Sequence, residues 1–294
     1  MSDDPYVKKI FGTDGLHFIQ LTQQLIHDFE TDSTTYTYMP PSEFHLLMAN
    51  DWKSGAKVYW MEMLGRAHLA AATSIIRASR WSSGMTTCYA AGLFLPFCAC
   101  FRALIESTAD TYDALSSVAI NLSECRADVN NVLKLAATKS LIAGELEEKL
   151  IHFSHARKLP TKNASPKSHN AKQAANYVNT LEKAGLAGLY ELYSELCQYT
   201  HPAAHSVASS LLPTSEDSFN LTTVCDSLQI ELMIEKNKPL LLPLLMYAFN
   251  PGALILKVLL HFDAPQFHAS GIRRVDLSGI SGWISCAKKM GVKP

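Results

Sequence analysis

The sequence predicts an all-α protein, a multi-helix bundle with an extended N-terminal arm and additional C-terminal helices. Apolar residues recur at three- and four-residue steps along most of the chain, as on the buried face of a helix. No stretch shows sustained alternation of apolar and polar residues, so strands are expected to be minor at most. Hydrophobic residues make up 48% of the 294 positions and charged residues 18%, which is typical of a globular, core-rich protein.

Composition narrows the functional classes. The formal net charge is −1, which argues against a protein that coats nucleic acid by bulk electrostatics, so such contact needs a local basic patch. The seven cysteines are odd in number and none has CxxC spacing, so Cys98 and Cys100 are expected to be core thiols rather than zinc ligands. Residues 1–4 are acidic and no apolar segment follows them, which predicts reduced thiols and a cytoplasmic location.

The first half of the chain predicts an arm and two long helices. Residues 1–52 are expected to form a short helix and an extended arm laid over the bundle. A first long helix is expected over 56–81, because this stretch is rich in Ala, Met, Leu and Arg. Residues 82–84 (Ser-Ser-Gly) are expected to end it, and a second long helix is expected over 85–119 with a bend at Pro96.

Shorter elements are expected in the second half. Helices are predicted over 121–141, 144–158, 170–184 and 186–200, with a turn-rich linker over 159–166. Residues 213–218 are expected to form a loop, with Ser218 or Asn220 capping the next helix. That helix is expected to run to about Lys236, followed by a proline-interrupted apolar helix to Phe262 and a short helix over 278–290. The short linkers favour one helical assembly of three segments, 1–52, 53–212 and 213–294, in which the last segment packs on the bundle.

Two apolar stretches resemble membrane spans. Residues 88–101 lack charge, but a bilayer needs about 20 residues, which is more than this stretch provides. Residues 239–256 are also uncharged, but they contain three prolines and a glycine, which indicates an interrupted core helix. We therefore expect no membrane partner.

The first polar cluster is Arg102, Glu106 and Asp110, set at four-residue steps in apolar surroundings. This spacing places all three on one helix face, where Arg102 and Glu106 can pair and the two carboxylates repel each other. A salt-bridged helix face explains the pattern. An inward-facing acid–base or phosphate-binding group explains it as well, as does a two-carboxylate metal site whose other ligands are undefined.

The second polar cluster runs from Tyr193 to His205 and ends a predicted helix. His201 and His205 have the HxxxH spacing typical of zinc ligands, but Pro202 between them interferes with a continuous helix. His201 is alternatively a helix cap that bonds a buried carboxylate, or part of a site shared with Arg102 and Glu106. We expect no bound metal and no cofactor.

A basic stretch lies between residues 149 and 181, which include no Asp or Glu. Such a stretch predicts a local basic surface for RNA or phosphate, or an ordinary soluble loop. Apart from Phe153 and the histidines, Tyr177 is the only aromatic residue in this stretch. A platform for stacked bases is therefore not indicated. The candidate binding residues in this stretch are Arg157, Lys158 and Lys162.

The order of these elements resembles a group of bacterial helical proteins related to the HEPN superfamily. The likeness covers residues 56–210 and rests on a long Ala-rich helix, an apolar helix ending in Arg-Ala-Leu-Ile-Glu (102–106), a basic linker, and Tyr-Ser-Glu-Leu-Cys-Gln-Tyr-Thr-His (193–201). It implies a HEPN-like bundle over 53–212, often homodimeric. It also implies a role in RNA cleavage, or as a partner in toxin–antitoxin or antiviral defence systems.

This chain departs from the HEPN nuclease pattern. The motif that the resemblance implies is an Arg followed four to six residues later by His, but no Arg occurs between Arg157 and Arg273. Arg102 could supply the missing cation beside His201 if the two helices were neighbours. His201 would then act as general acid or base, and Arg102 would stabilise the phosphorane charge.

Three functions are therefore carried forward. The first is a HEPN-like protein that acts through a protein partner or bound RNA or nucleotide, in a bacterial defence or stress module; the missing Arg favours it. The second is an RNA-cleaving effector that uses Arg102, Glu106 and His201. The third is a carboxylate–metal hydrolase, which requires Glu106, Asp110 and His201 to converge. Asp110, Tyr193 and His205 are further candidate binding residues.

Overall fold

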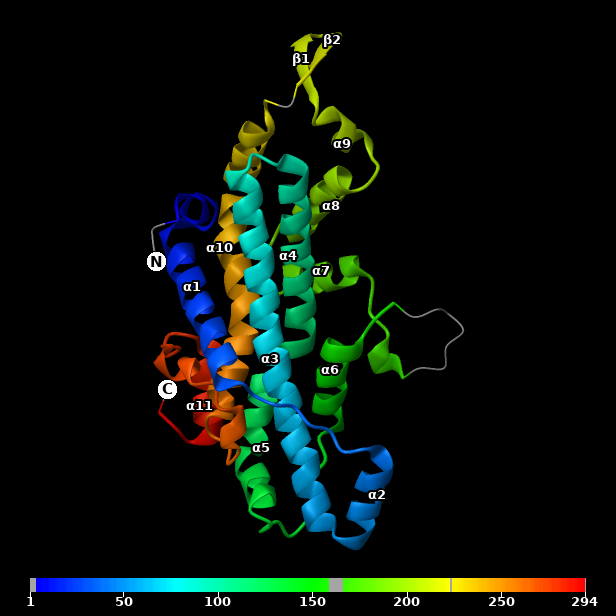
Figure 1. Cartoon of the computed structure of the whole chain (residues 1–294), viewed down its shortest axis with the longest axis vertical. Helices are drawn as coiled ribbons and strands as arrows, with labels where there is room; N and C mark the ends of the chain where they lie inside the picture. Colours follow the sequence, from blue (N-terminus) through cyan, green and yellow to red (C-terminus); the bar gives the residue numbers. More distant parts are fainter. Residues whose placement is uncertain (1–3, 159–165, 223, 294) are drawn as a thin grey trace. The chain divides into compact units, whose positions relative to one another are not determined.

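The computed structural model describes residues 4–158, 166–222 and 224–293, and most of this length is helical (Figure 1). The predicted all-α, multi-helix class is confirmed. The helices are α1 (Pro5–Asp32), α2 (Pro41–Asn50), α3 (Trp52–Ala90), α4 (Phe94–Leu115), α5 (Val118–Leu133), α6 (Gly144–His155), α7 (Ala174–Lys183), α8 (Leu189–Thr200), α9 (Ala204–Ala208), α10 (Asp226–Leu259) and α11 (Ser281–Met290). Short 3₁₀ turns lie at Lys167–His169, Pro265–Phe267 and Gly271–Arg274.

The described residues form two compact units, each discontinuous in sequence. Those in 4–23, 76–113 and 173–248 form unit 1, and those in 24–75, 114–172 and 249–293 form unit 2. Both units draw on all three of the segments expected from the sequence. The helices α1, α3, α4 and α10 contribute residues to both units.

Unit 1 is built on a hydrophobic core in which α4 and α8 take part. On α4, Phe97, Phe101 and Leu104 recur at three- and four-residue steps and are fully buried. Leu192 and Leu196 of α8 join the same core. Burial of one apolar stripe on each helix fixes which of its faces remain for polar side chains. This arrangement leaves Arg102 of α4 half-buried at the edge of the core.

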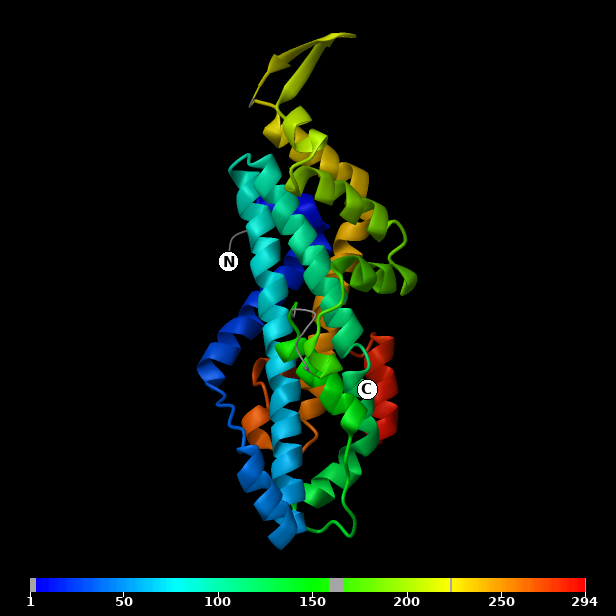
Figure 2. The same cartoon turned by 90° about the vertical axis from the view of Figure 1, so that its right-hand side faces the viewer.

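Unit 2 has its own buried core, which contains Trp60 of α3. The indole N–H of Trp60 donates to the carbonyl oxygen of Leu141 at 2.9 Å, so this large ring is buried without an unpaired donor. Helices α5 and α11 lie side by side (Figure 2). Gly252 of α10 lies so close to α3 that an added Cβ would stand 2.9 Å from the carbonyl oxygen of Ala71. Only glycine permits this approach.

Several expected element boundaries in the first half were wrong. Helix α1 has 28 residues rather than being short, and it is kinked at Gly12, whose φ of 76° is readily adopted by glycine. Helix α3 continues through Ser82–Gly84, where Gly84 gives close contact with Cys100 of α4. The chain turns instead at Gly92 (φ 61°). Pro96 causes no bend because it lies in the first turn of α4, where backbone N–H groups lack helical partners.

The later boundaries also differ. Helix α5 ends at Leu133 rather than 141, helices α6, α7, α8 and α11 are shorter than expected, and 3₁₀ residues precede α7. Residues 211–221 form an antiparallel hairpin of β1 (Leu211–Ser215) and β2 (Ser218–Leu221), not a loop. Ser218 and Asn220 therefore lie in β2 and cap no helix. The linker expected over 159–166 falls almost wholly outside the described residues.

Helix α10 is one helix of 34 residues, although an interruption was expected at its prolines. Each proline removes a single backbone hydrogen bond, and burial of Leu241, Leu244 and Ala248 supports the helix across that loss. Among the described helices, α10 is long and apolar enough to cross a membrane; its most apolar window has mean hydropathy 1.6 and is 56% buried. The core helix of a globular protein meets the same criterion, so this is weak evidence for a span.

Candidate functional site

The structure brings Arg102 and His201 into direct contact within unit 1. Nη1 of Arg102 lies 2.6 Å from Oγ1 of Thr200 and 3.1 Å from Nε2 of His201. Nε of Arg102 donates to Oε1 of Glu106 at 3.0 Å, one helical turn along α4. We call these four residues, Arg102, Glu106, Thr200 and His201, the Arg102 cluster. It joins parts of the two polar clusters expected from the sequence.

The end of α8 positions Thr200 and His201. Thr200 is the last helical residue, and His201 caps the helix with extended backbone and a bond from its N–H to the carbonyl of Cys197. Pro202 follows, and since proline disfavours helical backbone in the residue before it, the helix ends here. His201 is thus a helix cap, as one interpretation of the sequence held, but its ring contacts an arginine rather than a buried carboxylate.

The hydrogen bonds define the state of the His201 ring. A guanidinium group has only donors, so Nε2 of His201 accepts the bond from Arg102. The ring is therefore neutral in this arrangement and carries its hydrogen on Nδ1. Among the described residues, Nη2 of Arg102 donates no hydrogen bond to the protein.

The Arg102 cluster is accessible to solvent. The side chains of Arg102 and Glu106 are 23% and 31% exposed, and His201 is exposed. One cation and one carboxylate are held together, so the cluster is close to neutral overall. A site of this kind can bind a phosphate oxygen through the unused N–H groups of Arg102.

Asp110 does not join the Arg102 cluster. Its carboxylate lies 2.7 Å from Nη2 of Arg77 on α3, and the same nitrogen is 3.1 Å from the carbonyl oxygen of Ser107 and 3.0 Å from Oγ1 of Thr111. The repulsion expected between Glu106 and Asp110 is thus relieved because each carboxylate has an arginine partner.

Tyr193 lies on α8, one turn before Cys197. Burial raises the pKa of Tyr193 above its usual value, and a hydrogen bond with Cys197 and the nearby Glu106 carboxylate add to the shift. The phenol therefore stays protonated at neutral pH and can donate a hydrogen bond. Tyr193 packs against the core of unit 1, so a structural role is also consistent with its position.

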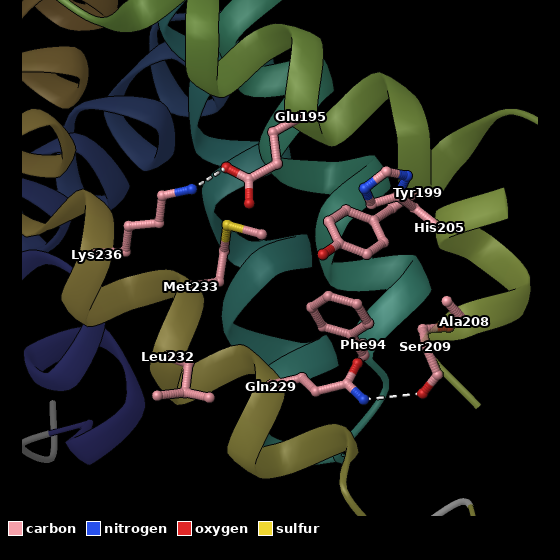
Figure 3. Close-up of a pocket in the computed structure, with 10 residues that line it drawn as sticks. All are labelled: Phe94, Glu195, Tyr199, His205, Ala208, Ser209, Gln229, Leu232, Met233 and Lys236. Carbon is pink, nitrogen blue, oxygen red and sulfur yellow. Dashed lines mark hydrogen bonds and ion pairs between the residues drawn. The ribbon is translucent and has the colours of Figure 1, made fainter. Parts of the chain in front are cut away.

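His205 lies apart from His201, on the rim of a separate pocket in unit 1 (Figure 3). Its ring meets Tyr199 edge-on at 5.8 Å, and Tyr199 meets Phe94 edge-on at 4.9 Å. The cavity has a volume of about 280 Å³ and is closed on one side by an ion pair of 2.8 Å between Glu195 and Lys236. That pairing raises the pKa of Lys236.

The described residues of the basic stretch up to Lys172 belong to unit 2, whereas residues 173–181 belong to unit 1. Arg157 forms a parallel bridge with Asn170, and its backbone N–H and carbonyl bond residues 169 and 171. Lys158 is exposed, and the rings of His155 and His169 stack at 6.0 Å. Lys162, a further candidate, lies outside the described residues.

Metal ligands do not gather in the described part of the chain. His201 and His205 lie on either side of the break between α8 and α9, so the HxxxH spacing makes no helical pair. In the residues that the structure describes, no group of three or more His, Cys, Asp or Glu side chains could hold a metal ion. Glu106 and Asp110 are each paired with arginine, which leaves the hydrolase hypothesis without converging ligands.

The sequence analysis missed two residues that contact the candidate site residues, Thr200 and Arg77. Thr200 was not singled out, although a hydroxyl directly before His201 was a usable signal. Arg77 was missed because it precedes Asp110 by 33 residues and carries no local pattern.

Comparisons of the chain with protein-family models, with curated proteins and with solved structures each returned no significant match.

Proposed function

We propose that this protein binds the phosphate of RNA or of a nucleotide at the Arg102 cluster. The observation that carries the proposal is the 3.1 Å contact between Arg102 and His201. The HEPN nuclease motif has an arginine four to six residues before its histidine, and this chain has no arginine at that spacing before His201. Arg102 reaches His201 from a different helix, so it can act in place of that missing residue.

The free hydrogen-bonding groups support binding of a phosphate. Nη2 of Arg102 is unused among the described residues, and Nδ1 of His201 carries a hydrogen. Each of these two neighbouring side chains thus keeps a donor for a ligand. Hydrogen bonds from a charged donor to phosphate are stronger than neutral ones, which favours a phosphodiester over an uncharged ligand.

The same geometry favours binding over cleavage. A general base needs a free ring nitrogen, and a neutral imidazole has only one. That nitrogen of His201 is occupied by Arg102 in this structure. The protein is therefore proposed to act by holding RNA or nucleotide, together with a protein partner or a second copy, in a bacterial defence or stress module.

Binding is tested with a fluorescein-labelled single-stranded RNA by fluorescence anisotropy. Arg102→Gln and His201→Gln are each expected to raise the Kd about fivefold or more, and Arg102→Gln to lower the salt dependence by about one phosphate contact. Lys238→Gln is the matched control, because Lys238 is an exposed cation of the same unit, paired with Glu235. Equal binding by all four proteins would contradict the proposal.

RNA cleavage is the second candidate, favoured by the arginine–histidine contact. Release of Nε2 from Arg102 would let His201 take the 2′-hydroxyl proton while the 2′-oxygen attacks phosphorus. The bond to the 5′-oxygen then breaks, the protonated His201 gives its proton to that leaving oxygen, and a 2′,3′-cyclic phosphate remains. Arg102→Ala and His201→Ala should each abolish cleavage of labelled RNA or toxicity on expression. Full activity of either variant would exclude this mechanism.

A further inference from the structure

A second pocket lies in unit 2, where the end of α10, residues 273–278, the start of α11 and Lys293 meet. Its volume is about 580 Å³, within the usual range of small-molecule sites. We call it the Trp283 pocket, because Trp283 of α11 forms part of its wall. None of the candidate residues discussed above lines it.

The lining of the Trp283 pocket is strongly cationic. It includes Lys257, Arg273, Arg274 and Lys293 against one carboxylate, Asp276. Arg274 is paired with Asp28, which leaves three cations facing one acid. Such an excess in a concave site concentrates anions.

Asp276 is already occupied by neighbouring groups. Its carboxylate accepts a hydrogen bond from the backbone N–H of Ser278 at 2.9 Å. This bond, the Ser278 hydroxyl and the nearby Lys257 lower the pKa of Asp276, so the carboxylate is ionised at neutral pH. The site therefore sets three positive charges against one negative charge, an excess that favours an anion at Arg273.

Lys257 supplies fixed positive charge beneath the pocket. Its Nζ donates to the carbonyl oxygens of Ile272, Arg273 and Val275 at 3.3, 3.4 and 2.9 Å, and it lies 6.0 Å from the centre of the Trp283 ring. These bonds use all three ammonium hydrogens, so Lys257 acts through its charge rather than as a free donor. Burial lowers its pKa, a cost that a bound anion would offset.

The positive charges near the Trp283 pocket also affect His261, which lies in its wall. Its ring stacks on Trp283 at 6.0 Å with an interplanar angle of 27°. Its pKa is lowered by burial and then by electrostatic interaction with Arg126, Lys257 and His268. Positive potential is thus present inside the wall as well as at the rim.

Donors and apolar surface remain available to a ligand. Arg273 and Lys293 are exposed at the rim, and the indole N–H of Trp283 has no partner among the described residues. The rest of the wall includes the apolar side chains Leu260, Val275 and Leu277. Cationic rim and apolar wall together match a ligand with an anionic end and an apolar body.

We propose that the Trp283 pocket binds a small phosphorylated molecule. Its phosphate oxygens lie at Arg273 and Lys293, and its apolar or aromatic part rests against Leu260 and Leu277. Arginine forms two parallel hydrogen bonds with phosphate, and lysine adds a point charge. A nucleoside diphosphate has this combination of groups.

Isothermal titration calorimetry of the full-length protein tests the site with two probes, ADP and inorganic pyrophosphate. We expect saturable binding of both, with ADP tighter, because only ADP reaches the apolar wall. The double variant Arg273→Gln/Lys293→Gln should weaken both by tenfold or more. Lys139→Gln is the matched control, since Lys139 is an exposed cation of the same unit outside the pocket.

Three outcomes would overturn the proposal. Neither probe binds up to about 5 mM; the double variant binds as the wild type does; or ADP and pyrophosphate bind equally, which indicates a bare polyphosphate site. Binding that is lost in Arg273→Gln/Lys293→Gln and kept in Arg102→Gln belongs to the Trp283 pocket, whereas nucleotide binding lost only in Arg102→Gln belongs to the Arg102 cluster. Failure here is therefore distinguishable from failure of the RNA-binding proposal, which depends on unit 1.

Discussion

Nη1 of Arg102 donates a hydrogen bond to Nε2 of His201, which lies 99 residues further along the chain. This bond ties α4 to the residue that ends α8. Nε2 of His201 accepts this bond, because the arginine can only donate. Stability and ligand binding should therefore both respond to changes at either residue.

The Arg102–His201 bond should contribute measurably to folding. In a double-mutant cycle of Arg102→Ala and His201→Ala, we expect a coupling free energy of about 0.5–1.5 kcal/mol, in the lower part of that range because His201 is exposed. The free energy of unfolding in urea provides the measurement. A coupling of zero would show that the bond is absent in solution.

Substitutions of Glu106 and Asp110 should have different effects on stability and on RNA binding. Asp110→Asn weakens the pair with Arg77 and is expected to lower the free energy of unfolding by about 1 kcal/mol without changing RNA affinity. Glu106→Gln frees Nε of Arg102 from its carboxylate and should tighten RNA binding by about twofold to fivefold. Urea unfolding and RNA anisotropy on both variants check this. Equal effects on RNA binding would contradict the separation.

Gly252 should tolerate no side chain. Gly252→Ala places a Cβ 2.8 Å from Oγ of Ser74 and 2.9 Å from the Ala71 carbonyl, and the backbone atom cannot move away cheaply. We expect a loss of about 1–3 kcal/mol, seen as a lower midpoint of thermal unfolding. Gly144→Ala is the control, because nothing lies within 4 Å of its added Cβ. A similar loss in both variants would exclude the packing explanation.

His68 should make stability depend on pH. It is 3% exposed, Nδ1 lies 2.7 Å from the Tyr36 hydroxyl, and burial lowers its pKa from 6.5 to about 4. Between these values the unfolded chain holds the extra proton, so the stabilisation is complete above pH 6.5 and is lost as the pH falls towards 4, by at most about 3 kcal/mol.

The pH effect is measured as the free energy of unfolding in urea between pH 7 and pH 5. His68→Gln should show a shallower dependence than the wild type, since its side chain does not titrate. His45→Gln, at an exposed position of the same unit, serves as the control and should retain the wild-type dependence. Identical slopes for His68→Gln and the wild type would refute the assignment.

Sequence periodicity predicted the helices well because a helix depends on neighbours within four residues. It failed where a distant contact decides the local structure. Gly84 looks like a helix breaker until Cys100 is packed against it, and the prolines of α10 look like interruptions until the burial of Leu241 and Leu244 is known. Local signals carry no information about such support.

The candidate site was predictable in part for the same reason. The pairing of Arg102 with Glu106 follows from i,i+4 spacing, and the sequence offered contact with His201 as one alternative among several. Which arginine reaches Asp110 depends on how α3 meets α4, so Arg77 could not be found. The Trp283 pocket was missed because its cations come from three separate segments, none of which is basic enough to attract attention.

The discontinuous make-up of the two units limits how the chain can be divided. Each unit is made of three separate stretches of sequence, and the helices α1, α3, α4 and α10 each have residues in both units. No single truncation can therefore yield one unit with its core whole. A stop codon after residue 172, for example, would remove α8 and leave Phe97 and Phe101 without Leu192 and Leu196. Genetic dissection of this protein must rely on point substitutions rather than on fragments.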